Sequence, residues 1–497
     1  MSKSSGIPEL NTYLLKEIFV RVPYVLSDIF KLSFDKGIVP DEWKVGYVTV
    51  IPKKGNTLYV DNLRPITQTN VLMKIFEKIM NKNLMEYFES FEILHPNQGG
   101  FRKNHSTIET VTTLVNFIAE AKNKKEYSIA VFLDLSKAFD SVNHSFLIKK
   151  LSNMGVKGNL FRWLKNYLEN RSQIVKNKNS SSDVFRIKSG VPQGSVLGPT
   201  LFLAYINDIK HLDLKCNINL FADDTVLYCS GPNLENLISS VQDDLDKICN
   251  WCTFNKLCLN AKKTNVLCFG KSFFRHPNLE SIPKLTLLSQ SLNYVEECDY
   301  LGIRLDYKLN MNSYMSKVKK SVLHKIYLLT KLRKFLTLKA SITIFKSMVL
   351  PYFEYGNIFL EACEVSVLKK LDRIFIRGLR VTLKNYEKTD EILLMKSVNI
   401  LPLQMRRDMS VAKLMFNKLS KNEVEIQKRT KSRIHDGPAL VWPEVTNDKF
   451  KRYIPHLGPT IWNKLPSDLR NIQDKDSFKC MVKKHFESLF KNLDTTI

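Results

Sequence analysis

Two stretches of the chain have the pattern of buried β-strands. Residues 43–51 place apolar or β-branched side chains on both faces of a predicted strand that stops at Pro52. After Ser128, residues 129–133 form a continuous apolar run, which predicts a second buried strand, and Asp134 follows it directly. Burial of a carboxylate there is costly unless it is paired or ligated, so Asp134 is the first candidate for chemistry.

A pair of adjacent acids, Asp223 and Asp224, interrupts the apolar, β-prone segment 218–228. Asp is unfavourable in strands and common in turns, so the segment is predicted to form a tight hairpin with both acids at its tip. Two carboxylates so close repel each other unless a cation lies between them. The pair is therefore either a solvated turn or one half of a metal site.

Apolar residues at helical spacing predict helices within residues 1–40, from Leu72 to Phe91 and from Asn233 to Asn255. Residues 191–199 form a loop rich in Gly and Pro, and Pro199 is placed to open a helix that runs to Ile209. This mixture predicts an α+β fold whose antiparallel sheet carries the acids.

The charge of the chain is strongly biased toward basic residues. Its 497 residues, 44% of them hydrophobic, suffice for two or three domains, and 75 Lys and Arg against 49 Asp and Glu give a net charge of +26. Residues 311–497 hold 36 basic and 18 acidic residues, a surplus of 18. This favours a polyanionic partner, nucleic acid before membrane, over charge that serves only solubility.

Residues 311–353 contain nine basic residues and no acid. Seven apolar residues recur there at helical spacing and predict a buried face opposite a basic one: Met315, Val318, Val322, Ile326, Leu329, Leu332 and Leu336. Such a helix suits a phosphate backbone, although a calmodulin-binding or membrane-surface helix has a similar pattern. The candidates for nucleic-acid contact are Lys317, Lys320, Lys331, Arg333 and Lys334.

The start of the chain has no apolar signal region, and no apolar run is long enough to span a membrane. We therefore expect an intracellular protein, in the nucleus or cytoplasm or both, with nine reduced cysteines. Cys249 and Cys252 form a CxxC pair, but no second pair follows at the spacing of a zinc site.

Asp134, Asp223 and Asp224 could belong to one site if the strand before Asp134 lies beside the Asp223–Asp224 hairpin. They would then meet at one edge of the sheet as oxygen-only ligands, which suit Mg²⁺ or Mn²⁺. Two such ions ~4 Å apart would activate a hydroxyl and stabilise the leaving oxygen of a phosphoryl displacement.

Seven motifs in order resemble the reverse transcriptase of non-LTR (LINE-type, jockey-like) retrotransposons. An isolated acid pair is usually a turn, but the ordered set is specific. The motifs are Ile51-Pro52-Lys53-Lys54-Gly55 with Leu63-Arg64-Pro65-Ile66, Gln98-Gly99-Gly100-Phe101-Arg102-Lys103, Phe132-Leu133-Asp134 through Phe139-Asp140, Gly190-Val191-Pro192-Gln193-Gly194 through Pro199, Phe221-Ala222-Asp223-Asp224, Asn260-Ala261-Lys262-Lys263-Thr264 and Tyr300-Leu301-Gly302-Ile303.

The resemblance implies roles for individual residues. Asp134, Asp223 and Asp224 would be the catalytic ligands of two Mg²⁺ or Mn²⁺ ions, and Lys263 would protonate the leaving pyrophosphate, although a solvated lysine fits its loop equally well. Candidates for nucleotide binding are Lys53 or Lys54, Arg64, Phe139, Gln193 and Gly194, with Phe139 under the sugar as a block to a 2′-hydroxyl. Arg102 is a candidate for contact with the template or within the fingers.

The architecture implied by the resemblance is a right-hand polymerase. Fingers and palm would occupy residues 1–309, a helical basic thumb residues 310–430, and an element-type tail residues 431–497. The partners would be an RNA template, a DNA primer and deoxynucleoside triphosphates. In the tail, Trp462 is either a buried core residue or a stacking platform for a base.

Complete jockey-like proteins carry an endonuclease ahead of the polymerase, whereas here the polymerase-like region begins close to Met1. The expected function is RNA-directed DNA synthesis without that nuclease. The alternative is a catalytically silent nucleic-acid-binding protein, truncated or domesticated from such an element. A maturase or a telomerase-like enzyme fits less well, because neither carries a tail like residues 458–470.

Overall fold

A five-stranded sheet lies at the centre of the molecule, in a computed structural model that describes residues 12–53, 62–177, 180–270, 284–387, 389–424, 439–446 and 448–493. The strand order is β14-β11-β3-β9-β8, and every pairing is antiparallel except that of β14 with β11. The strands are β3 (Tyr127–Leu133), β8 (Asn217–Phe221), β9 (Asp224–Gly231), β11 (Asn265–Phe269) and β14 (Asn293–Tyr294). The predicted buried strand before Asp134 and the predicted hairpin at Asp223–Asp224 are confirmed.

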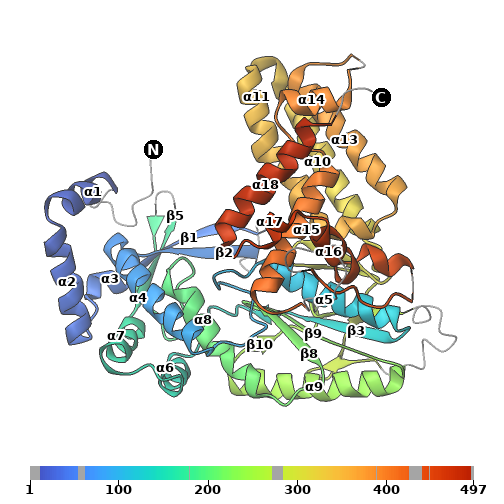
Figure 1. The fold of residues 1–497 in the computed structure, drawn as a ribbon. Helices are drawn as coiled ribbons and strands as arrows, with labels where there is room; N and C mark the ends of the chain where they lie inside the picture. Colours follow the sequence, from blue (N-terminus) through green and yellow to red (C-terminus); the bar gives the residue numbers. More distant parts are fainter. Residues whose placement is uncertain are drawn as a thin grey trace.

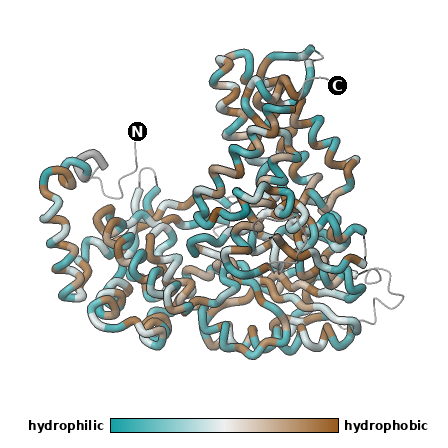
Figure 2. Tube along the Cα trace, in the orientation of Figure 1, coloured by the Kyte–Doolittle hydropathy of each residue, from teal (hydrophilic) through white to brown (hydrophobic). Residues whose placement is uncertain are grey.

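Helices cover both faces of this central sheet (Figure 1). Helix α5 (Thr107–Asn123) packs on one face, against β3, β8 and β9, and α9 (Leu234–Phe254) packs on the other. The side chains of β3 alternate between two hydrophobic cores, with Ala130 and Phe132 in the core on one face and Ile129 and Val131 in the core on the other. Along α9, hydrophilic and hydrophobic positions alternate as expected of a helix with one buried face (Figure 2).

A second, smaller sheet joins the early part of the chain to the segment around residue 175. β1 (Val45–Pro52) pairs antiparallel with β2 (Leu63–Gln68) and parallel with β5 (Ser172–Asn177), and two short strands, β6 (Ser180–Ser181) and β7 (Phe185–Arg186), pair with β5. The sequence-based prediction of a buried strand over 43–51 is partly wrong. Trp43 belongs to helix α3 (Asp41–Lys44), and Val50 and Ile51 are 43% and 50% exposed. The reason is that β5 pairs with only residues 45–48, so the end of β1 extends beyond it.

Seven helices surround the small sheet and the adjoining edge of the central one: α1 (Thr12–Arg21), α2 (Pro23–Lys36), α3, α4 (Val71–Ser90), α6 (His144–Asn153), α7 (Gly158–Leu168) and α8 (Leu197–Ile206). The predicted helix from Leu72 to Phe91 is confirmed by α4. The prediction that Pro199 opens a helix is wrong by two residues, because α8 begins at Leu197 and a 3₁₀ turn, η2 (Asn207–His211), follows it. Residues 1–11, part of the predicted N-terminal helical region, lie outside the described residues.

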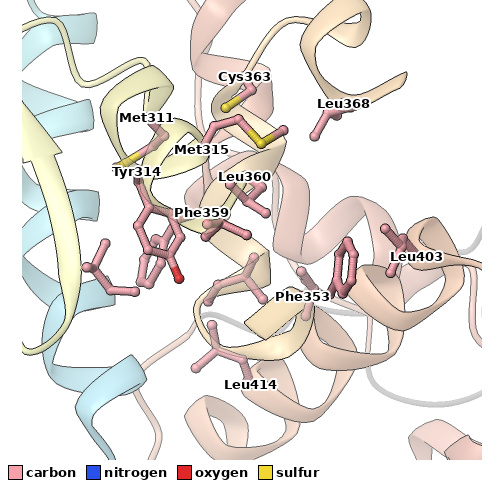
Figure 3. Packing of buried hydrophobic residues seen from close by; sticks show 14 of the residues in the cluster. Met311, Tyr314, Met315, Phe353, Phe359, Leu360, Cys363, Leu368, Leu403 and Leu414 are labelled. Atoms are coloured by element: carbon pink, nitrogen blue, oxygen red, sulfur yellow. The ribbon is translucent and has the colours of Figure 1, made fainter. Parts of the chain in front are cut away.

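A helical tower, the predicted thumb, rises from the central sheet (Figure 1). Its elements are α10 (Asn312–Leu332), η5 (Arg333–Phe335), α11 (Leu338–Ile344), η6 (Phe345–Val349), α12 (Leu350–Glu354), η7 (Asn357–Ala362), α13 (Val365–Leu383), α14 (Glu391–Ser397) and α15 (Leu403–Ser420). At its root, Tyr314, Met315, Leu360, Leu368 and Leu414 meet in one apolar cluster (Figure 3).

The apolar face predicted for α10 is confirmed from Met315 to Leu329, whose members are buried. Leu332 and Leu336 do not continue it as predicted. Leu332 is 49% exposed and Leu336 only half-buried, because α10 ends at Leu332 and the 3₁₀ turn that follows changes the angular position of successive side chains.

The C-terminal segment shares the hydrophobic core of the helical tower. Helices α16 (Ile454–Asn463), α17 (Ser467–Arg470) and α18 (Lys475–Lys491) follow the 3₁₀ turn η8 (Asp448–Arg452), and both α16 and α18 pack on α15. Trp462 is 1% exposed and contacts Phe478, so it is a core residue and not a surface for stacking a base. The hydroxyl of Tyr453 donates to the carbonyl of Leu309, which ties this segment to the central part of the chain.

The predicted α+β class with an antiparallel sheet carrying the acids is confirmed. The remaining short strands are β4 (Leu135–Ser136) paired with β10 (Cys258–Leu259), β12 (Thr286–Leu287) paired with β13 (Gln290–Ser291), and β15 (Glu297–Tyr300) paired with β16 (Ile303–Asp306). Among the residues that the structure describes, no helix has both the length and the apolar character needed to cross a membrane.

Candidate active site

Strand pairing brings the three predicted acids to one edge of the central sheet. Leu133, the last residue of β3, lies opposite Thr225 on β9, so Asp134 emerges beside Asp224. Phe221 and Asp224 close the β8–β9 hairpin, whose two-residue turn is Ala222–Asp223. Ala222 takes a left-handed conformation with φ of +56°, which a tight turn of this kind requires.

The surroundings of the three carboxylates disfavour their charged forms, chiefly through desolvation. Desolvation, followed by the negative charges of Asp223 and Asp134, raises the pKa of Asp224 to about 6. Desolvation and the charge of Asp223 raise the pKa of Asp134, against the opposing charges of Lys263 and Lys53. Desolvation also raises the pKa of Asp223, although a backbone hydrogen bond and the charge of Arg64 oppose it.

This donor set suits a divalent cation. Three carboxylates whose negative charge is unfavourable as they stand gain most from a cation among them, and their ligands are all oxygen. Within the described residues, no three His, Cys, Asp or Glu side chains are arranged as a formed metal site. The backbone register nevertheless brings the three acids to one edge of the sheet.

The turn that carries the acids is held by a residue that the sequence left without a role. The Oε1 atom of Gln98 accepts hydrogen bonds from the backbone N–H of Ala222 at 2.9 Å and of Gly100 at 2.8 Å. The N–H of Gly99 also donates to the carbonyl of Leu220, at 2.8 Å. Gln98 is 3% exposed, so its oxygen satisfies two donors inside the protein.

The Gln98 segment leaves little room for a side chain at two positions, beside the hairpin at Gly100 and beside helix α5 at Gly99. A Cβ atom on Gly100 would lie 2.4 Å from the backbone nitrogen of Ala222. On Gly99 it would lie 2.3 Å from the Oγ1 atom of Thr110. The only signal in the sequence was the Gln-Gly-Gly pattern, which does not say what the glycines approach.

Lys263 reaches the site through the turn before β11. The N–H of Asn260 donates to the carbonyl of Asp134 at 2.9 Å, and the Asp134 N–H donates to the hydroxyl of Thr264 at 3.4 Å. These bonds dock the 260–264 turn on Asp134, and the exposed Lys263 lies close enough to lower the pKa of that acid.

Two predicted cations from the small sheet lie close enough to influence the acids. Lys53 follows β1, and its backbone N–H donates to the carbonyl of Asn62 at 2.7 Å, closing the β1–β2 pair. Arg64 on β2 is exposed and pairs in register with Ile51. The charge of Lys53 acts on Asp134 and that of Arg64 on Asp223. Lys54 lies outside the described residues.

The loop with Gln193 and Gly194 is fixed to the small sheet and to the segment after Asp134. The carbonyl of Gln193 accepts from Thr67 N–H at 2.7 Å, and its side chain donates to Asp140 at 3.0 Å. Gly194 has φ of +128°, and a Cβ there would lie 2.4 Å from the carbonyl oxygen of Thr67. The close backbone approach therefore demands glycine.

A buried acid that the sequence analysis did not single out holds this loop through a hydrogen bond. Glu77 on α4 is fully buried, accepts from Val196 N–H at 2.6 Å and from the Tyr167 hydroxyl at 2.8 Å. Burial raises the pKa of Glu77, against the hydrogen bonds that favour its ionised form. Arg171 packs over the ring of Tyr167 at 4.7 Å and completes the cluster.

Phe139 stands at the junction between core and site. It is half-buried, stacks on Phe202 with a centroid distance of 4.5 Å and meets Phe101 edge-on at 6.3 Å. The aromatic cluster fixes the ring beside the turn that follows Asp134, and its role under the sugar stays a prediction.

The structure gives intramolecular partners to several predicted nucleic-acid contacts. Arg102 donates to both oxygens of Glu89, at 2.9 and 2.6 Å, and to the carbonyls of His95 and Gln98. It thus braces the Gln98 loop, and its contact with nucleic acid stays a prediction.

The predicted α10 cations divide into two groups. Lys317 pairs with Asp299 at 2.9 Å, and Arg333 is buried and donates to the carbonyls of Thr382 and Leu336, so Arg333 does not belong to the exposed basic face as predicted. Lys320 is exposed, while Lys331 and Lys334 lie over the rings of Tyr327 and Phe335.

Comparisons with known proteins agree with this geometry. The family model described as "Reverse transcriptase (RNA-dependent DNA polymerase)" matches residues 51–305, which include all three acids. The chain is 30% identical over 387 residues to the RNA-directed DNA polymerase from mobile element jockey of Drosophila melanogaster, covering 76% of this chain and 41% of that protein. It is 30% identical over 371 residues to the probable RNA-directed DNA polymerase from transposon BS of the same organism, covering 72% and 40%.

The chain thus spans about two fifths of the length of these relatives. Among solved structures, apo telomerase from Candida tropicalis superposes with a TM-score of 0.41 at 12% identity, covering 78% of this chain and 67% of that chain.

Proposed function

The chain belongs to the reverse transcriptase (RNA-dependent DNA polymerase) family, and we propose that it is the RNA-directed DNA polymerase of a non-LTR retrotransposon. The reaction is the transfer of a nucleotide from a deoxynucleoside triphosphate to the 3′-hydroxyl of a primer on an RNA template. The observation that carries the proposal is the meeting of Asp134 with Asp223 and Asp224 at the ends of paired strands, with Lys53, Arg64 and Lys263 beside them.

The family generally uses divalent metal ions, and the three acids are the residues that would hold two Mg²⁺ or Mn²⁺ ions. Bound there, the ions would lower the pKa of the primer hydroxyl and neutralise charge on the triphosphate. The raised pKa values of the three carboxylates support this assignment, since a cation offsets the desolvation that raises all three and the repulsion that adds to it at Asp134 and Asp224.

The cations around the acids suit a triphosphate. Arg64 would hold phosphate oxygens with its planar guanidinium, and Lys53 would act as a point charge. Lys263, exposed beside Asp134, would give a proton to the pyrophosphate oxygen as the bond to the α-phosphate breaks.

The remaining site residues would place the nucleotide. Gln193 and Gly194 would support the template base and the incoming nucleotide, since their loop is held against β2 and Asp140. Phe139 would lie under the sugar and exclude a 2′-hydroxyl, with Phe202 behind it to keep the ring in place. RNA template and DNA primer would run past Lys320 and Lys331 on α10 and Lys334 on η5, where aromatic rings lie beside two of the three cations.

The test is primer extension on poly(rA)·oligo(dT) with dTTP and Mg²⁺ or Mn²⁺. Asp223→Asn is expected to reduce the rate by about a thousand-fold or more, because several kcal/mol of transition-state stabilisation depend on the metal site. Asp213→Asn is the matched control, since it removes one exposed carboxylate remote from the sheet edge and should extend normally.

Equal extension by the wild type and Asp223→Asn would overturn the assignment of the site. Salt-dependent RNA binding without any extension by the wild type would favour the alternative, a nucleic-acid-binding protein on an inactive polymerase scaffold.

A further inference from the structure

Helix α13 carries a row of cations that the proposed reaction does not use. From Val365 to Lys384 the chain has six basic residues and one acid, Asp372. Four of the cations are spaced three or four residues apart and so share one face of the helix: Lys370, Arg373, Arg377 and Arg380. The opposite face, with Leu368, Leu371, Phe375 and Leu379, is buried in the core of the thumb. We call these four cations, with Lys319 across the seam on α10, the α13 basic surface.

Two hollows along the seam between α10 and α13 concentrate these charges. The first, of about 220 Å³, is lined by Lys319 and Lys370 from the two helices and by no acidic residue. The second, of about 520 Å³, is lined by Arg373, Arg377 and Arg380, with Glu391 as its only acid. Each hollow therefore holds an excess of positive charge, which favours an anion.

The cations at the centre of this surface are available to a ligand. Among the described residues, Lys319, Lys370, Arg373 and Arg377 have neither an ion pair nor a side-chain hydrogen bond. Arg373 and Arg377 are exposed, as is Tyr386, at 69%, on the rim of the second hollow. Arg380 instead donates to the carbonyls of Glu387 and Thr389 and so fixes the rim.

The α13 basic surface is separate from the face of the thumb that we assign to primer and template. In Figure 1, α11 lies on the side of the tower toward α1–α4, and α13 lies on the other side. Lys320 and Lys331, which we assign to primer and template, lie about 80° and 100° around α10 from Thr330 at the second hollow, at 100° per residue. The assigned primer–template residues therefore point about a quarter of a turn away from the hollows around α10.

We propose that the α13 basic surface binds the phosphodiester backbone of a second nucleic-acid segment, outside the cleft that holds primer and template. Lys370 and Arg380 are ten residues apart on the helix, about 15 Å. One strand of a duplex places about four phosphates over that length. Arginine forks bind phosphate oxygens bidentately, and Tyr386 offers a ring for a base at the rim.

The test measures the affinity of the protein for a second strand when its primer–template cleft is already occupied. It rests on the proposed function, because that function supplies the cleft. The protein is first saturated with an unlabelled hairpin primer–template, and a fluorescent 20-nucleotide RNA or DNA of one sequence is then titrated. Arg373→Gln/Arg377→Gln should weaken binding of the labelled strand by about 25-fold at 0.1 M salt and lower the slope of log K against log salt by about 1.4. Tighter binding of RNA than of DNA would show that the surface prefers RNA. Equal binding would show that it recognises the phosphodiester backbone common to both.

Lys149→Gln/Lys157→Gln is the matched control, since it removes two exposed lysines near α6 and α7 and should leave the titration unchanged. Equal losses in both variants, or no binding of the labelled strand once the cleft is filled, would overturn the proposal. A similar loss of affinity for the hairpin itself would also overturn it, because the surface would then belong to the cleft. Failure of the wild type to extend the hairpin would count against the proposed function, while the titration would still report on this surface.

Discussion

The Oε1 atom of Gln98 lies 2.9 Å from the backbone nitrogen of Ala222 and accepts its hydrogen bond. Ala222 immediately precedes Asp223 and Asp224, so a side chain from one motif holds the turn that presents the acids of another. The same oxygen accepts from Gly100, which makes Gln98 a positioning residue for the proposed metal site.

Gln98→Leu is expected to lower kcat for primer extension more than it changes KM for the nucleotide. The substitution leaves two buried N–H groups without an acceptor, at a cost of about 1–3 kcal/mol each, and loosens the turn before Asp223. Steady-state kinetics and thermal unfolding measure the effect. Gln290→Leu, at an exposed position on β13, is the control, and an equal effect of both variants would contradict the assigned role.

Glu77→Leu is expected to raise KM for the deoxynucleoside triphosphate. The substitution removes the two carboxylate oxygens that accept from the Val196 N–H and the Tyr167 hydroxyl, so the loop with Gln193 loses the hydrogen bond that anchors it to α4. Glu77→Gln should restore most of the affinity, because its amide oxygen can accept from Val196 while the Tyr167 hydroxyl reverses and accepts from the amide nitrogen. If glutamine fails to rescue KM, the negative charge of Glu77 matters and not only its hydrogen bonds.

Gly194→Ala is expected to displace the Gln193 loop and to impair nucleotide binding. The new Cβ would meet the Thr67 carbonyl at 2.4 Å, at a φ of +128° that side chains rarely adopt. Gly158→Ala separates the two causes, because Gly158 also has a positive φ, +64°, but no atom within 4 Å of the added Cβ. Gly158→Ala should cost only about 1 kcal/mol of stability and leave KM unchanged.

Protonation of Asp224 is expected to limit metal-dependent activity below about pH 6, where its pKa lies. A protonated carboxyl binds a cation poorly, so activity should rise with pH through that value. In buffer with a chelator, the contribution of Asp224 to the free energy of unfolding is expected to fall as pH rises, whereas metal-dependent activity is expected to increase. The folded protein holds this proton more tightly than the unfolded chain, whose pKa is near 3.8, so the contribution of Asp224 to stability is lost as pH rises from about 4 to 6.

Thermal unfolding against pH, with chelator and with Mg²⁺, measures this effect. Asp224→Asn should flatten the dependence between pH 4 and 6, since the amide does not titrate. An unchanged profile in that variant would assign the titration to another group.

Phe139→Leu is expected to increase use of ribonucleotides relative to deoxyribonucleotides. A smaller side chain leaves room for a 2′-hydroxyl, and a pocket contact of this size is worth about tenfold or more in kcat/KM. Phe202→Leu disturbs the same aromatic stack from the side away from the sugar, so it should lower stability without changing the ratio. An equal change of the ratio in both variants would make Phe139 a packing residue only.

Local patterns in the sequence determined where the acids stand along the chain. The apolar run before Asp134 and the Asp pair between β-prone segments each needed only nearest neighbours to predict a strand end and a turn, and both are confirmed. Helices α4 and α9 were predictable for the same reason, because their apolar spacing repeats over five turns or more. The prediction was wrong for the end of β1, where exposure depends on how far a partner strand extends.

The supports of the site, in contrast, were decided only by the tertiary structure. Gln98 meets Ala222 across 124 positions and Glu77 meets Val196 across 119, and nothing in the local sequence states either pairing. The exposure of each cation was also decided by the tertiary structure. Arg333 is buried and donates to the Thr382 carbonyl, whereas Arg373 and Arg377 are exposed. The sequence by itself determined the identity and order of the reactive groups, because these are properties of residues and their neighbours. Which atoms hold them in place, and which charges remain free to bind, follow from contacts between distant segments that form only on folding.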